Sequence, residues 1–171
     1  MATGKRMVRE GLVVGLIGYA AVAIFYAVFD FLAARGGLYT VNLLGRAVFR
    51  GLRDPAVLQL PLPADPGAIG LFSGLHLVIS LGIGLVVTWL VWQAEGPPAQ
   101  ARLAWLTIVA GFFVTIFGIG MLSGPIQDLL PWWSVVLANV LAVLVAGSYL
   151  LRRHPGLLHR PGMGEADERR V

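Results

Sequence analysis

The sequence predicts an all-α integral membrane protein: a bundle of four transmembrane helices with an amphipathic surface helix between the first and second spans. Composition is the first reason. Of the 171 residues, 57% are hydrophobic and only 13% are charged, about half the charged fraction of an ordinary soluble domain. The second reason is that four stretches are long and apolar enough to cross a bilayer. The remaining segments are too short and polar to build a separate soluble core.

The four spans are expected at about residues 12–34, 69–93, 103–122 and 132–151. A helix needs about 20 mostly apolar residues to cross a hydrocarbon core of roughly 30 Å. Asp30 is the single charged residue of the first span, and the other three contain no Asp, Glu, Lys or Arg. Residues 1–151 should therefore form one membrane domain. Residues 152–171, polar and rich in Pro and Gly, are expected to be a mobile cytoplasmic tail.

The N-terminus resembles a secretory signal in its positive charge, but its apolar run extends from Gly11 to Phe29. A signal peptide has an apolar region of only about 7 to 15 residues. We therefore expect an uncleaved first span.

The distribution of basic residues favours a topology with both termini in the cytoplasm. In that topology the inner side carries nine Lys and Arg residues and the outer side four, as the positive-inside rule requires. We expect the protein in a cell membrane, and specifically in a bacterial cytoplasmic membrane. The inner residues are Lys5, Arg6, Arg9, Arg102, Arg152, Arg153, Arg160, Arg169 and Arg170, and the outer ones are Arg35, Arg46, Arg50 and Arg53.

The connection between the first two spans contains a predicted amphipathic helix at about residues 40–53. At 100° per residue, one side carries Val41, Leu44, Val48 and Leu52, and the opposite side carries Arg46, Arg50 and Arg53. This pattern predicts a helix on the outer membrane surface that ends at the Asp54–Pro55 pair. The arginines are interpreted as a solvated edge, or alternatively as a site for anionic lipid or an acidic partner.

Small residues predict where the helices approach one another closely. Lipid provides no hydrophobic force between helices, so close backbone contact matters more. We expect such faces at Gly11, Gly15 and Gly18 in the first span, at Gly70 and Gly74 in the second, and at Gly120 and Gly124 in the third.

One polar residue from each span is expected at a similar depth. Counted from the outer ends, Asp30 lies about 6 Å deep, and His76, Thr115 and Asn139 about 10 Å deep. Tyr26 shares a helix face with Asp30, and Ser73 and Ser80 share one with His76. Intramembrane ionisable groups usually face the bundle interior and pair, so Asp30 is predicted to accept a hydrogen bond from His76. This polar layer either fixes helix packing, forms a functional path or pocket, or lets His76 bind a cofactor.

Several function classes have no support in the sequence. The chain has no cysteine, which excludes disulfides and thiol chemistry. His154 and His159 lie about 20 Å from His76 across the membrane, too far to share one haem iron with it. One histidine and one carboxylate are too few for a usual metal site, and Ser73 with His76 and Asp30 lacks the strained turn of a nucleophile. We therefore expect no cofactor, no metal and no catalytic residues. Basic residues at membrane edges do not indicate nucleic-acid binding.

The leading hypothesis is a small non-enzymatic membrane protein that acts as an accessory or assembly subunit of a larger membrane complex. Its partners would be the lipid bilayer and another membrane protein or a second copy of the chain. The alternative is a small transporter or proton-coupled carrier with an outward-facing polar cavity around Asp30, His76 and Asn139.

Overall fold

The computed structural model describes residues 2–51, 61–123, 126 and 128–157. These residues form helices and connecting turns, with no strand in the part described. The elements are α1 (Ala2–Leu32), α2 (Tyr39–Phe49), α3 (Pro66–Ala94), α4 (Pro98–Ser123), α5 (Trp132–Arg153) and the short 3₁₀ helix η2 (Pro155–Leu157). Residues 158–171, most of the expected tail, lie outside the described residues.

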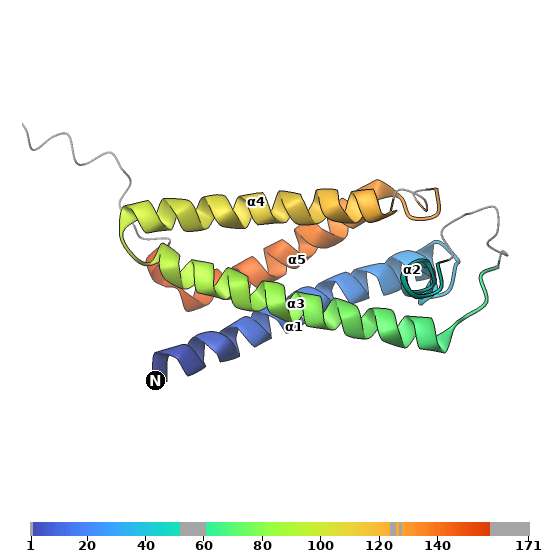
Figure 1. Ribbon diagram of the computed structural model, residues 1–171, viewed down its shortest axis with the longest axis horizontal. Helices are drawn as coiled ribbons and strands as arrows, with labels where there is room; N and C mark the ends of the chain where they lie inside the picture. The colour runs from blue at the N-terminus through green and yellow to red at the C-terminus, as the bar shows by residue number, and fades with distance from the viewer. Residues whose placement is uncertain (1, 52–60, 124–125, 127, 158–171) are drawn as a thin grey trace, which may run out of the picture.

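The four predicted spans are confirmed as four helices that are long and apolar enough to cross a membrane, α1, α3, α4 and α5. α3, α4 and α5 reach beyond the stretches predicted for them, whereas α1 begins ten residues earlier than predicted and ends two residues before the predicted end at residue 34. The start of α1 and the end of α5 lie at the same end of the bundle (Figure 1). We call this the N-terminal end, and the opposite end, where α2 lies, the α2 end.

The most extensive contact between two helices is the crossing of α1 and α3, which lie across each other in Figure 1. A Cβ added to Gly15 would lie 2.6 Å from the Leu81 Cα, and one added to Gly11 would lie 2.8 Å from the Leu85 Cα. On the facing side, a Cβ at Gly84 would collide with the backbone of both α1 glycines. Hydrogen at these positions lets the two backbones touch, as the spacing of Gly11 and Gly15 predicted.

The other expected small-residue faces have mixed outcomes. The prediction is wrong for Gly18, Gly70 and Gly74, since no atom lies within 4 Å of a Cβ added to any of them. Gly120 does make a close approach, but to the ring of Trp132 rather than to a neighbouring backbone. Gly124 lies outside the described residues.

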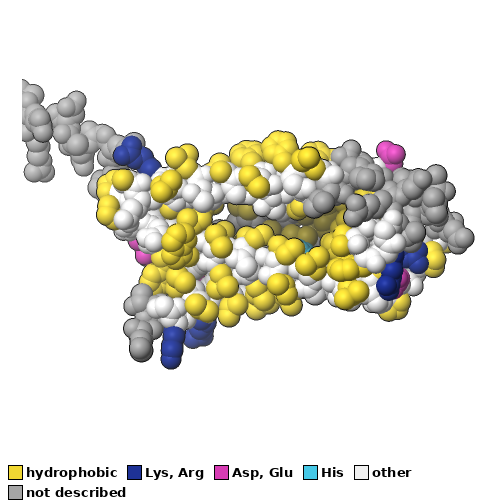
Figure 2. Space-filling view, viewed as in Figure 1, with side chains coloured by type: hydrophobic (Ala, Val, Ile, Leu, Met, Phe, Trp, Pro, Cys, Tyr) yellow, Lys and Arg dark blue, Asp and Glu magenta, His cyan; other side chains and the backbone are white. Residues whose placement is uncertain are grey.

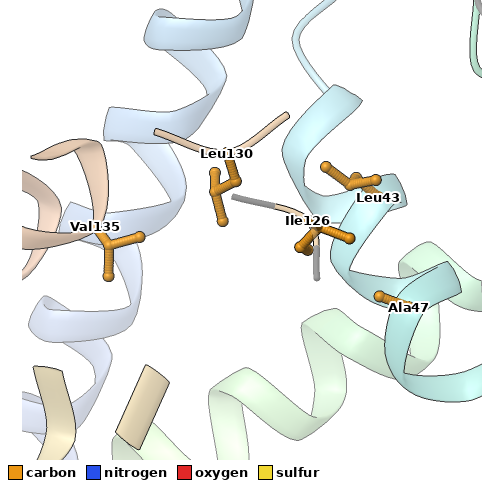
Figure 3. Packing of buried hydrophobic residues seen from close by; sticks show 5 residues of the cluster. All are labelled: Leu43, Ala47, Ile126, Leu130 and Val135. Carbon is orange, nitrogen blue, oxygen red and sulfur yellow. The ribbon is translucent and has the colours of Figure 1, made fainter. Parts of the chain in front are cut away.

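Helix α2 closes the α2 end of the bundle through a small apolar core (Figure 3). Leu43 and Ala47 of α2 pack with Ile126 and Leu130 of the α4–α5 connection and with Val135 of α5. The buried side of α2 is therefore centred on Leu43 rather than on the predicted apolar side of Val41, Leu44 and Val48; Val48 is 47% exposed. Leu52 lies outside the described residues.

Helix α2 ends earlier than predicted. Its last residue is Phe49, and Arg50 follows as the C-cap. Gly51 then has a φ of 67°, a left-handed conformation that glycine adopts easily and that stops a helix. The end at residue 53 was predicted from the Asp54–Pro55 pair, but Gly51 stops the helix before that pair is reached.

Helix α4 is attached to the bundle mainly along α3 and has few contacts with α5. Figure 2 shows an opening between α4, at the top of the view, and α3 below it. The side of α4 away from the bundle carries large exposed apolar side chains, among them Leu106, Val114 and Phe117. α4 is therefore the long helix with the fewest contacts to the rest of the bundle.

Candidate functional site

Asp30 lies near the end of α1 and is only 1% exposed. Its carboxylate accepts two hydrogen bonds from Thr40, one from the backbone N–H at 2.6 Å and one from the hydroxyl at 2.7 Å. Thr40 is the second residue of α2, and the N-cap residue Leu38 offers no side-chain acceptor. Asp30 therefore satisfies the free N–H at the start of α2, where a negative charge is also favoured by the helix dipole.

The predicted hydrogen bond from His76 to Asp30 is not formed. The imidazole of His76 instead packs against the ring of Tyr19, with the ring centroids 5.1 Å apart. Tyr19 precedes Asp30 by eleven residues on the same helix, a separation of about 16 Å along the axis. The depth estimate failed because α1 ends at Leu32 and α3 begins at Pro66, so Asp30 lies near the helix end while His76 lies well inside.

Among the other members of the expected polar layer, Thr115 and Asn139 are bonded within their own helices, and Tyr26 of α1 reaches α5. Thr115 donates to the Gly111 carbonyl at 2.8 Å, and Asn139 donates to the Val135 carbonyl at 2.8 Å. Tyr26 lies 3.5 Å from the Ser134 hydroxyl oxygen. Ser73 and Ser80 are half-buried. Asp30, His76, Thr115 and Asn139 are not joined to one another by any hydrogen bond in the part of the chain described.

In the predicted basic face of α2, Arg50 forms an ion pair at the junction between α2 and α3. Arg50 donates to Asp65 through Nε at 2.9 Å. Asp65 is also the N-cap of α3 and accepts from the Ala68 N–H at 2.9 Å. The hydrogen bond from Arg50 is the largest cause that lowers the pKa of Asp65, from 3.8 to about 2. Arg46 is partly buried, and Arg53 lies outside the described residues.

A second polar cluster lies at the N-terminal end and was missed by the sequence reasoning. The imidazole of His154 is held between two carboxylates: its Nε2 lies 3.0 Å from Glu10 Oε1 and its Nδ1 2.8 Å from Glu95 Oε1. Trp92 donates to the other oxygen of Glu10 at 3.3 Å. We call these four residues the His154 cluster.

The His154 cluster joins three helices. Glu10 comes from α1, Trp92 and the C-cap Glu95 from α3, and the C-cap His154 from α5. Glu10, Glu95 and His154 lie just outside the predicted apolar stretches. They were therefore not among the polar residues predicted within the spans. Because successive spans run antiparallel, the start of the first span and the ends of the second and fourth lie at the same end of the bundle. This order of the spans is the sequence feature that could have predicted the His154 cluster.

The side chains of Asp30 and of the His154 cluster form hydrogen bonds that join one helix to another. No nucleophile is activated by His154, because each of its ring nitrogens faces a carboxylate. Among the described residues, no group of three or more His, Cys, Asp or Glu side chains could hold a metal ion. The geometry therefore favours a role in packing the helices.

Comparisons of the chain with protein-family models, with curated proteins and with solved structures found no match. The features of the chain that bear on its function are thus the Asp30–Thr40 contact, the His154 cluster and the exposed side of α4.

The tie between Asp30 and α2 can be tested with Thr40→Val, which removes the hydroxyl donor from a buried carboxylate. We expect the free energy of unfolding to fall by about 1–3 kcal/mol, the usual effect of leaving a buried polar group short of a partner. Reversible unfolding in mixed micelles measures it. Thr107→Val is the matched control, because that exposed hydroxyl donates to its own helix, and it should change stability by less than about 0.5 kcal/mol. Equal effects of the two substitutions would contradict the tie.

The ion pair of Asp65 predicts an acid-sensitive corner. Its pKa in the folded protein is about 2, below the ordinary 3.8, so its charge contributes stability above the higher value. This contribution is lost as the pH falls through about 2. We therefore expect the thermal midpoint of the wild type to exceed that of Asp65→Asn at about pH 5, and the difference to shrink toward pH 2. Asparagine also caps helices, so the comparison isolates the charge, and a difference independent of pH would contradict the prediction.

Proposed function

We propose that this protein is a small non-enzymatic integral membrane subunit that assembles with another membrane protein through α4. We place it in a bacterial cytoplasmic membrane with both termini in the cytoplasm, because nine Lys and Arg residues then lie inside and four outside.

The observation that carries this proposal is the loose attachment of α4. The opening beside it (Figure 2) lies between apolar helices, and an empty space there would forfeit dispersion contacts. Lipid chains or a helix of a partner would fill it. The exposed side of α4 has six large apolar side chains on one helix face: Leu103, Leu106, Phe113, Val114, Phe117 and Met121. A continuous apolar stripe of this kind suits packing against another transmembrane helix.

The polar side chains of the spans are hydrogen-bonded within the protein, which also favours a subunit over a carrier. A carrier cavity would need Asp30, His76 and Asn139 to face a common space. Asp30 is buried against Thr40, and Asn139 is bonded to its own helix. The carrier alternative therefore has no specific observation in its favour.

We further propose that α2 rests at the outer membrane surface. Besides its buried side, the helix region has exposed apolar side chains at Leu38, Val48 and Phe49, with exposed fractions of 59%, 47% and 37%. Arg50 lies beside them and is exposed. Apolar groups next to a basic side chain suit the boundary between acyl chains and headgroups.

Site-specific photo-crosslinking tests the α4 proposal. A photoreactive residue replaces Val114 on α4, which is 72% exposed, and in a matched control replaces Val78 on α3, which is 67% exposed. We expect position 114 to crosslink to one membrane protein, or to a second copy of the chain, that also co-purifies in mild detergent. Position 78 should crosslink only to lipid.

The proposal would be overturned by crosslinks to lipid alone from both positions, together with a chain that purifies as a monomer without a partner. Crosslinks to the same protein from both positions would also count against a surface specific to α4.

A further inference from the structure

We propose that Glu10, Glu95 and His154 form a proton-dependent tie that holds the α3–α4 corner against the end of α5 and releases it when His154 loses a proton. This inference goes beyond the proposed function, because it concerns the helices of the chain itself and holds whether or not a partner binds α4.

With both carboxylates ionised, the geometry around the imidazole requires two ring protons. Both ring nitrogens lie at hydrogen-bond distance from a carboxylate oxygen, 3.0 Å to Glu10 and 2.8 Å to Glu95. An ionised carboxylate only accepts hydrogen bonds, and a neutral imidazole has only one N–H. The two bonds to ionised carboxylates therefore form together only when His154 is an imidazolium.

Burial determines which bond is lost when the imidazolium gives up a proton. The side chains of His154 and Glu10 are 5% and 8% exposed, whereas that of Glu95 is 40% exposed. An unpaired carboxylate costs far more when buried than when it reaches water. The remaining N–H should therefore stay on Nε2 and bond Glu10, which also accepts from Trp92, and the bond to the more exposed Glu95 should be the one that is lost.

The Lys and Arg side chains of the described residues near this end of the bundle do not pair with Glu10. Arg153 of α5 lies over the Tyr149 ring, 5.5 Å from its centroid. Lys5, Arg6 and Arg9 of α1, Arg102 of α4 and Arg152 of α5 are exposed. Among the described residues none of these cations forms an ion pair with Glu10. Within the proposal, the imidazolium of His154 is therefore the positive charge beside the buried Glu10.

The loss of the Glu95 bond would loosen α4. Glu95 immediately precedes the turn into α4, which begins at Pro98, and α4 itself has few contacts with α5. The bond from His154 to Glu95 is thus a polar connection between α5 and the α3–α4 corner. When it breaks, the corner and the first turns of α4 should move away from α5.

Distance measurements between spin labels test the release. The chain has no cysteine, so Gln100→Cys on α4 and Arg152→Cys on α5, both exposed, can be labelled in the full-length protein in lipid nanodiscs. We expect a single short distance at about pH 5 and a second, longer population at about pH 9 as the outcome of the proposed release.

The variant Glu95→Gln separates this tie from other pH effects. The glutamine amide can accept a hydrogen bond from a protonated imidazole and donate one to a neutral imidazole. The contact with His154 should therefore form at both pH values, and the longer distance should not appear at either. Asp128→Asn, which removes an exposed carboxylate at the α2 end, is the matched control and should keep the pH response. An unchanged distance in the wild type, or the same shift in Glu95→Gln, would overturn the proposal.

Nitrogen-15 NMR of histidine-labelled protein gives a second readout that needs no folded variant at position 95. The signal of His154, identified by its loss in His154→Gln, should show two N–H groups at about pH 5 and one at about pH 9. A neutral imidazole at the lower pH would overturn the proposal.

Discussion

The rest of the structure depends on the contact between α1 and α3, where two backbones touch at glycines. In a bilayer the lipid tails are as apolar as the helices, so burial of apolar surface does not drive association and close packing must do so. Gly11 and Gly15 of α1 meet the backbone of α3 around Gly84. Because the backbones lie too close for a Cβ at these positions, the contact fixes the register of the two helices as well as their distance.

That register decides which polar groups meet at the two ends. It brings Tyr19 to His76 in the middle of the pair and leaves the ionisable residues near the helix ends. At the α2 end, Asp30 receives the start of α2 through Thr40. At the N-terminal end, Glu10 comes within reach of His154. The bundle is thus packed through small residues in its middle and tied by hydrogen-bonded polar side chains near its two ends.

The sequence predicted the four long helices because hydropathy over some 20 residues is a strong, local signal. Their lateral contacts were predicted only in part, since glycine spacing marks Gly11 and Gly15 but marks Gly70 and Gly74 equally well. The partner of Asp30 was not predictable, because two or three residues at a helix end shift a side chain by several ångströms. The His154 cluster joins residues 144 positions apart. Their contact depends on how the helices are aligned along one another after packing, which the sequence alone did not reveal.

The most direct test of this account compares Gly84→Ala with Gly82→Ala in the same helix. A Cβ at Gly84 meets the backbone of α1, whereas one at Gly82 has no atom within 4 Å. The measurement is the free energy of unfolding in mixed micelles. We predict that Gly84→Ala lowers it by about 1–3 kcal/mol, the usual cost of overpacking, and that Gly82→Ala does not lower it. Equal stability of the two variants would contradict a fold that depends on the α1–α3 contact.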